Sequence, residues 1–205
     1  MILKDLPVEQ IVSHITSKEL SVDEVVEYYL ERIKRFNHSL NAIVSLRNEE
    51  EIREEARNKK LHKSKEGKEM LLFGLPLAVK DLTDVEGLPT SYGLPELKNN
   101  IANQNSIIVD RLSNHGAIII GKTNTPELGI GSHTKNKLFG VTANVFDLSK
   151  SAGGSSGGAA SAVASSMVPF ADGSDMMGSC RNPAAYANLY GFRPTPGLIP
   201  EKRDF

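Results

Sequence analysis

The stretch SAGGSSGGAASAVA, residues 151–164, contains only Gly, Ser, Ala and Val. A run of this composition is either a flexible linker or a backbone that another segment approaches closely. A linker is expected to separate two domains and to be polar on both sides. This run instead continues into a small-residue helical pattern over 157–167 and an apolar segment, VPFADG (168–173). The pattern therefore predicts a closely approached backbone inside the core.

The same run contains G-x-S-x-G over 153–157, the nucleophile-elbow pattern of α/β-hydrolases. In that fold the catalytic histidine follows the serine along the chain. Here every histidine precedes Ser155, at positions His14, His38, His62, His115 and His133. The run also lacks both glycine-rich phosphate-binding patterns, G-x-x-x-x-G-K-[ST] and G-x-G-x-x-G. A catalytic serine here would therefore need a base other than histidine, and lysine is a known substitute.

The segments around this run alternate between strand and helix patterns. GLPLAVKD (74–81) is a short apolar run bounded by turn residues, SIIVDRLSNHG (106–116) has helical spacing, and AIIIGK (117–122) is typical of a central strand. The order strand, helix, strand predicts an α/β fold whose sheet is at least partly parallel. We also expect a strand over 168–173, a helix over 182–189, a polar connector over 61–70 and a turn-rich segment over 191–200.

The N-terminal region, residues 1–60, is predicted to be mainly helical. Ser21 and Glu24 have the spacing of a capping box, in which serine and glutamate bond to each other's backbone N–H. Apolar residues follow at helical spacing, at Val22, Val25, Val26, Tyr29, Ile33 and Phe36. A short strand is expected over 41–46 and a charged surface helix over 49–60.

Composition narrows the classes of function. The 205 residues include 24 basic and 25 acidic side chains, and this balance gives no electrostatic reason to expect nucleic-acid binding. No apolar run approaches the ~20 residues of a membrane span, and the N-terminus lacks a secretory signal pattern. Cys180 is the single cysteine, so an internal disulfide is impossible and a cytoplasmic location is expected. The scattered histidines lack metal-ligand spacing, so no metal is expected.

Two further residues are candidates for chemistry, and each has an ordinary structural interpretation. Lys80 ends the apolar run LPLAVK, where it is either a solvated lysine at a strand end or a buried base. Ser179 precedes Arg181-Asn182-Pro183 and is either a helix N-cap or a nucleophile. The residues taken singly leave these alternatives open.

Taken together, five segments resemble the amidase signature family. They are GLPLAVKD (74–81), GKTNTPELGIGSHT (121–134), the Gly/Ser run at 151–164, ADGSDMMGSCRNPAA (171–185) and GFRPTPG (191–197), in the family's order. Ser179 follows Ser155 by 24 positions (179 − 155), which is the spacing of that family's serine pair. The resemblance implies an α/β fold with a mixed sheet flanked by helices, in a single domain over 1–205 with the signature core at 71–200.

The resemblance also implies roles for individual residues. Enzymes of this family hydrolyse carboxamides of small molecules through a Ser–Ser–Lys triad and an acyl-enzyme, without a cofactor. On matching positions Ser179 is the nucleophile, Ser155 the relay serine with a cis peptide bond, and Lys80 the base. The implied oxyanion donors are the backbone N–H groups of Met176, Met177, Gly178 and Ser179. The implied supporting residues are Ser156, Asp175 and Arg181.

Two departures from the family pattern leave alternatives open. Met177 stands where the family usually has glycine, and its side chain is expected either to line the acyl pocket or to pack in the core. Family members are more than twice this length, so the sheet is expected to be incomplete. The chain is then an active amidase, an inactive fragment, or a piece that needs a separate C-terminal piece or a homo-oligomer. The amidase component of a tRNA-dependent amidotransferase is a further alternative, although that component commonly has glutamine where this chain has Asn182.

Overall fold

A computed structural model describes residues 3–61, 67 and 69–200. Its α-helices are α1 (Val8–Thr16), α2 (Val22–Leu40), α3 (Glu49–Asn58), α4 (Ile107–Asn114), α5 (Gly157–Ala164) and α6 (Arg181–Tyr186). Its strands are β1 (Ile43–Leu46), β2 (Pro76–Lys80), β3 (Ile118–Thr123), β4 (Lys135–Asn136) and β5 (Gly140–Val141). Short 3-10 turns span Leu3–Asp5, Pro95–Leu97 and Glu127–Gly129. Among the described residues, no helix has the length and apolar character needed to cross a bilayer.

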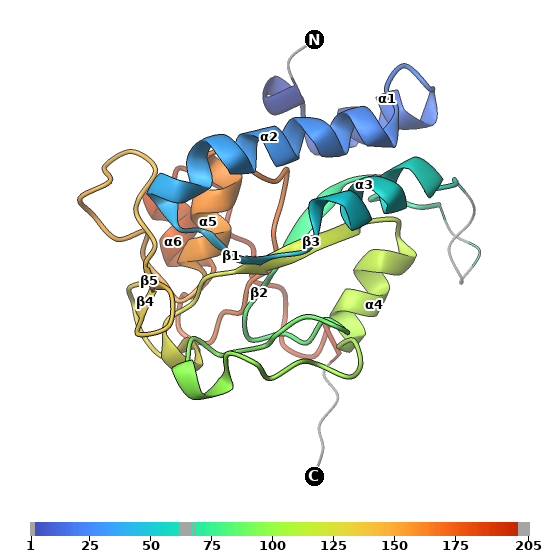
Figure 1. Ribbon diagram of the computed structural model, residues 1–205. Coiled ribbons are helices and arrows are strands. Elements are labelled where there is room, and N and C mark those ends of the chain that lie inside the picture. The colour runs from blue at the N-terminus through green and yellow to red at the C-terminus, as the bar shows by residue number, and fades with distance from the viewer. Residues whose placement is uncertain (1–2, 62–66, 68, 201–205) are drawn as a thin grey trace.

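The central sheet has three strands in the order β1-β3-β2 (Figure 1). β2 runs parallel to β3, with α4 as the crossover between them, and β1 pairs antiparallel with β3. The predicted α/β fold with a partly parallel sheet is therefore confirmed, and the sheet is mixed. β4 and β5 form a separate antiparallel pair.

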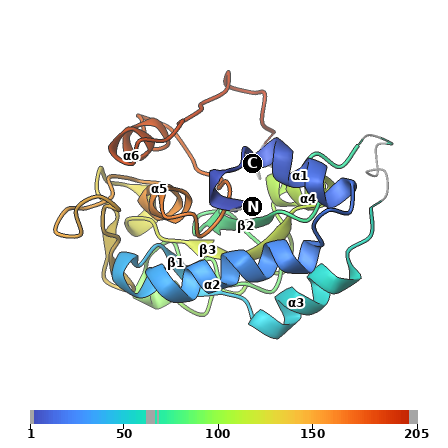
Figure 2. The same cartoon turned by 90° about the horizontal axis from the view of Figure 1, so that it is seen from above.

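Helices cover both faces of this sheet. Figure 1 shows α2 and α3 above the strands and α4 below them, and Figure 2 shows α5 lying between α6 and the sheet. The larger apolar cluster joins α2 and α5 to Ile118 and Ile120, whereas the smaller joins Val109 of α4 to Val79 and Ile119. Alternate residues of β3 thus enter different clusters, as the pleat of a strand requires.

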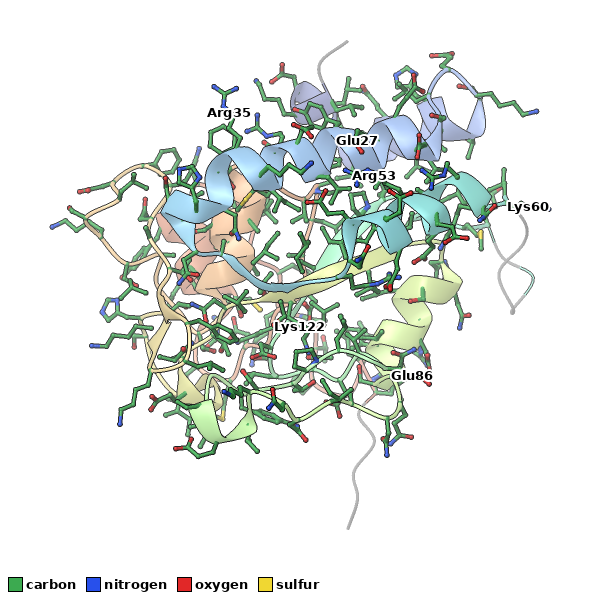
Figure 3. The ribbon with its side chains drawn as sticks, viewed as in Figure 1. Glu27, Arg35, Arg53, Lys60, Glu86 and Lys122 are labelled. Atoms are coloured by element: carbon green, nitrogen blue, oxygen red, sulfur yellow. The ribbon has the colours of Figure 1, made fainter. Side chains whose placement is uncertain are left out.

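The N-terminal helices form largely as the sequence predicts, with a break between α1 and α2. Glu24 N donates to Ser21 Oγ at 3.1 Å and Ser21 N donates to Glu24 Oε2 at 2.8 Å, so the capping box is present. Figure 3 shows Arg53 of α3 beside Glu27 of α2, where Arg53 Nε and Glu27 Oε2 are 2.7 Å apart. This ion pair joins the two helices on the outer side of the molecule.

The predicted strand over 168–173 is wrong. Ala171 makes one isolated parallel bridge to Ala78, and the rest of the segment forms no ladder. The carboxylate of Asp172 accepts the backbone N–H of Lys80 at 2.6 Å, so a side chain takes the place of the next ladder bond. The helix predicted over 182–189 is also shorter than expected, because Asn188 has a left-handed φ of 54°. Of the predicted connector over 61–70, residues 62–66 and 68 lie outside the described residues.

Candidate functional site

Lys80 is the last residue of β2 and is 1% exposed. Its Nζ atom donates to the hydroxyl oxygens of Ser155 at 2.7 Å, Ser156 at 3.0 Å and Ser174 at 2.9 Å. The solvated alternative for Lys80 is therefore wrong. The contacts bring together three segments far apart in the sequence: the end of β2, the start of α5 and the chain after Ala171.

Burial lowers the pKa of Lys80 to about 8, because removal from water disfavours the ammonium form. Interactions with the ionised forms of Cys180, Asp172 and Asp175 act in the opposite direction without cancelling this effect. A lysine with this pKa carries a substantial fraction of neutral amine near neutral pH, which is the form that can accept a proton.

The serine loop before α5 is held tightly against its surroundings. The Gly154–Ser155 peptide bond is cis, and Gly153 has a φ of 81°. A Cβ atom at Gly158 would collide with the backbone of Asn124, and one at Gly157 would collide with the Thr134 side chain. The glycines therefore allow a close approach of α5 to the segments after β3, which confirms the interpretation against a linker.

The turn that carries Ser179 is organised by the carboxylate of Asp175. This carboxylate accepts the backbone N–H of Gly178 at 2.7 Å and of Cys180 at 3.2 Å. Arg181 adds two side-chain bonds, from Nε and Nη2, each at 2.9 Å. The Arg181 guanidinium and these N–H groups hold the pKa of Asp175 well below its usual range. Asp175 and Arg181 therefore support the turn.

Ser179 is half-buried and is joined to the serine loop through its backbone. Ser156 N donates to the Ser179 carbonyl oxygen at 3.0 Å, which fixes the start of α5 beside the Ser179 turn. Within the described part of the chain, no hydrogen bond joins Ser179 Oγ to Ser155 Oγ. The structure thus brings Lys80, Ser155 and Ser156 into direct contact and holds Ser179 at their edge.

The four predicted oxyanion donors differ in their surroundings. Gly178 has a φ of 103°, and its N–H is engaged by Asp175. The N–H groups of Met176, Met177 and Ser179 bond to no described residue. Met177 is outside the left-handed region, so replacing the family glycine brings no strain there, and its side chain is 84% exposed. The expectation that Met177 packs in the core is therefore wrong.

Sequence reasoning missed two residues of this site, Asp172 and Ser174. Both lie in the segment ADGSD (171–175), and their polar character next to an apolar stretch was the available signal. It also missed a second buried lysine, Lys122 of β3, whose Nζ lies 3.7 Å from Asp81 Oδ1. In the residues that the structure describes, no group of three or more His, Cys, Asp or Glu side chains is arranged to hold a metal ion.

Comparison with known proteins identifies the family. The family model named Amidase matches residues 24–203. The chain belongs to the amidase family. A solved bacterial aryl acylamidase of the amidase signature enzymes has the same fold, with a TM-score of 0.86 and 35% identity over 97% of this chain and 41% of that one.

Curated members of the family differ in what they are named for. An acylamidase from Rhodococcus erythropolis is 43% identical over 198 residues, which are 96% of this chain and 41% of that protein. The A subunit of the glutamyl-tRNA(Gln) amidotransferase from Caldanaerobacter subterraneus subsp. tengcongensis is 39% identical over 199 residues, 97% of this chain and 40% of that protein. The chain thus spans about two fifths of the length of these relatives.

Proposed function

We propose that this chain carries the catalytic unit of an amidase that hydrolyses a small-molecule carboxamide through an acyl-enzyme. Ser179 is the nucleophile, Ser155 the proton relay and Lys80 the base. The observation that carries the proposal is the buried Lys80 amine, 2.7 Å from Ser155 Oγ and with a pKa lowered to about 8. A serine hydroxyl becomes an effective nucleophile when an adjacent base accepts its proton.

The reaction proceeds in two stages, acylation of Ser179 by the substrate and hydrolysis of the resulting ester. Ser179 Oγ adds to the amide carbonyl carbon while its proton passes to Ser155 Oγ, whose own proton passes to neutral Lys80 Nζ. The C–N bond then breaks, and the proton returns along the relay to the leaving nitrogen, which leaves an ester on Ser179 and a free amine. Water adds to the ester carbon by the same relay, and the products are a carboxylic acid and free Ser179. These steps balance with the side chains and water alone.

Charge on the tetrahedral oxyanion is stabilised by backbone N–H groups of the Ser179 turn. Met176, Met177 and Ser179 offer N–H groups with no described partner, and Gly178 joins them only if it releases Asp175. One such donor commonly contributes about 3–4 kcal/mol in the transition state. The absence of a hydrogen bond between Ser179 Oγ and Ser155 Oγ in the described residues is compatible with Ser179 as the nucleophile, because catalytic hydrogen bonds are often long until substrate binds.

The test is to label the intact chain with a fluorophosphonate and to locate the adduct by mass spectrometry. We expect one adduct on Ser179, which should be absent in Ser179→Ala. The control variant is Ser149→Ala, because Ser149 lies on an exposed turn, and it should label like the wild type. Heat-denatured protein serves as the background. An adduct that persists in Ser179→Ala overturns the assignment, and a folded chain that takes no label supports the inactive-fragment alternative.

A second candidate function is that of the amidase component of a tRNA-dependent amidotransferase. The amidotransferase relative from Caldanaerobacter, almost as similar as the acylamidase, is the observation that favours it. Such a component would release ammonia from glutamine only with its partner subunits and tRNA. Glutaminase activity measured with and without these partners separates the two functions, and partner-independent hydrolysis of simple anilides favours the amidase.

We further propose that this chain binds a polypeptide region equivalent to the remaining part of the acylamidase relative. Large apolar side chains near the Ser179 turn are exposed and available to it, namely Met176, Met177, Tyr186, Tyr190 and Phe192. Exposed apolar groups of this kind mark interaction surfaces. Light scattering of this chain, alone and mixed with the C-terminal part of the Rhodococcus acylamidase, should show a one-to-one complex. In the mixture, fluorophosphonate should label Ser179 faster than in the chain alone. A homo-oligomer that ignores the added polypeptide contradicts this partner.

A further inference from the structure

Three hydroxyl groups surround the Lys80 amine, and the proposed triad uses one of them. Ser155 is the relay, Ser156 joins α5 to the Ser179 turn, and Ser174 has no role so far. Ser174 Oγ nevertheless lies 2.9 Å from Lys80 Nζ, as close as an ordinary hydrogen bond. Its residue lies 94 positions from Lys80 in the sequence, so only the fold brings the two together.

The number of hydroxyls matches the bonding directions of the amine. An ammonium has three N–H donors, so all three serine oxygens can accept at once. A neutral amine has two N–H donors and one lone pair, so one of the three hydroxyls must donate to the nitrogen instead. The relay requires that this hydroxyl be Ser155, and the two N–H bonds must then point at Ser156 and Ser174.

The other bonds of these serines agree with that division. Ser156 Oγ lies 3.4 Å from the Ser174 carbonyl oxygen, to which it donates, which leaves its lone pairs to accept from Lys80. The Ser174 side chain bonds to Lys80 and to no other described group. Ser156 and Ser174 are therefore acceptors on two sides of the amine, and Ser155 occupies the third.

We propose that Ser174 is a positioning residue whose hydroxyl accepts one Lys80 N–H and so turns the lone pair of the neutral amine toward Ser155. This role rests on the proposed function, because it serves the relay through Ser155. It also has a second consequence: the ammonium form of Lys80 loses a hydrogen bond when the Ser174 hydroxyl is removed. Both consequences can be measured separately.

Replacing Ser174 removes no charged residue from the surroundings of Lys80. Asp172 contacts the Lys80 backbone, Asp175 is bound by Arg181, and Cys180 lies beside Ser156 with a pKa that burial raises. Helix α5, GGAASAVA, carries no charged residue, and Lys122 of β3 bonds to groups on the other side of the sheet. A shift on substitution therefore reports the hydroxyl itself.

The experiment titrates the Lys80 Nζ resonance by NMR in the wild type, Ser174→Ala and Ser174→Thr, with Lys80→Met to assign the signal. The wild-type midpoint is expected near pH 8. Ser174→Ala should lower it by about one-half to one pH unit, because the bond that the hydroxyl accepts from the ammonium is stronger than the bond that it accepts from the neutral amine. Ser174→Thr, which keeps a hydroxyl, should restore it. The limiting labelling rate of Ser179 should fall about tenfold in Ser174→Ala, since the lone pair loses its direction.

The two readouts separate this inference from the proposed function. Ser174→Ala with an unchanged Lys80 midpoint overturns the role of Ser174, even where Ser179 is labelled in the wild type. A shifted midpoint in a chain that never labels supports the hydrogen bond and overturns the function. Ser165→Ala, which removes a buried hydroxyl bonded to the backbone of Ser161, is the matched control and should change neither readout.

Discussion

Two buried lysines, the last residue of β2 and the residue before the last of β3, face opposite sides of the sheet. Lys80 of β2 is 1% exposed and Lys122 of β3 is 0% exposed, and burial lowers the pKa of both. Lys122 Nζ lies 3.7 Å from the Asp81 carboxylate and donates to the Thr83 carbonyl at 2.6 Å. Lys80 Nζ instead meets hydroxyl groups only, and in the described residues it forms no ion pair. Figure 3 labels Lys122 below β3, on the side of α4.

The difference teaches how one residue type serves structure in one place and chemistry in another. Burial lowers the pKa of Lys122, the Asp81 carboxylate opposes that effect, and the Lys122 side chain ties β3 to the segment after β2. Hydroxyl partners accept from the ammonium but can also donate to the neutral amine. Burial lowers the pKa of both lysines, and the hydroxyl neighbours, in place of a carboxylate, distinguish Lys80 as the proposed base.

Of the two lysine-to-methionine variants, Lys80→Met should have the larger effect on the labelling of Ser179. Lys80→Met removes the proposed base, and the labelling rate of Ser179 should fall about a thousandfold, the usual scale of general-base contributions. The protein should stay folded, because a buried amine without a counter-ion is replaced by an apolar chain. Labelling kinetics and circular dichroism measure the two effects. A Lys80→Met protein that labels at the wild-type rate contradicts the role of Lys80.

The opposite outcome is expected for Lys122. Lys122→Met leaves the Asp81 carboxylate buried without its cation, and breaking such a pair typically costs about 3–5 kcal/mol in the free energy of unfolding. Urea denaturation measures the loss. The double variant Asp81→Asn/Lys122→Met removes the orphaned charge and should recover part of it. Equal stability of the single variant and the wild type would mean that the pair is not structural.

Sequence alone could not separate these lysines. Both follow apolar strand patterns, LPLAV before Lys80 and AIIIG before Lys122. Their sides depend on a register shift between Leu77 and Ala78, after which Val79 pairs with Lys122 and Lys80 with Thr123. A local sequence pattern does not predict how two strands pair, so only the resemblance to the family distinguished Lys80 from Lys122.

The same limit explains the other failures of prediction. The capping box at Ser21 and the glycines at 157 and 158 were found because their causes are local in sequence or visible as small-residue composition. The strand over 168–173 was wrong because the Asp172 side chain replaces a ladder bond. Ser174 was missed because its partner, Lys80 of β2, lies 94 positions away in the sequence, and local spacing does not encode such contacts.

The depressed pKa of Lys80 should appear in the pH dependence of stability. The unfolded lysine binds its proton up to the ordinary lysine pKa of 10.5, whereas the folded one releases it near pH 8. Between these values the unfolded state holds more protons, so stability should rise with pH, by roughly 3 kcal/mol across the window. Below pH 8 the folded state carries the full cost of the buried charge.

Subtracting the unfolding curves of Lys80→Met isolates this contribution from other titrating groups. The difference between wild type and variant should be constant below about pH 7 and should change by roughly 3 kcal/mol between about pH 7 and about pH 11. A difference that is flat with pH would show that the folded pKa of Lys80 is close to that of the free side chain.

The labelling rate should follow the same titration, because neutral Lys80 is the proposed base. The rate should rise about tenfold per pH unit below the midpoint near 8 and level off above it. Between about pH 6 and pH 9 the gain approaches a hundredfold. Labelling reactions quenched at several times at each pH and quantified by mass spectrometry give the dependence of the rate on pH. Lys122→Met, where it remains folded, should keep the same midpoint, which tests whether the two lysines act independently.

The smallest effect is expected at Thr90, whose Oγ1 accepts from Lys122 Nζ at 3.1 Å. Thr90→Val keeps the shape of the side chain and removes one acceptor, while the Thr83 carbonyl and Asp81 remain. The loss in the free energy of unfolding should be about 1.5–3 kcal/mol, the worth of one hydrogen bond to a charged group. Labelling of Ser179 should be unchanged, in contrast to Ser174→Ala, where one acceptor is removed from the other lysine. If Thr90→Val alters the labelling midpoint instead, the two sides of the sheet are coupled and the division between a structural and a chemical lysine fails.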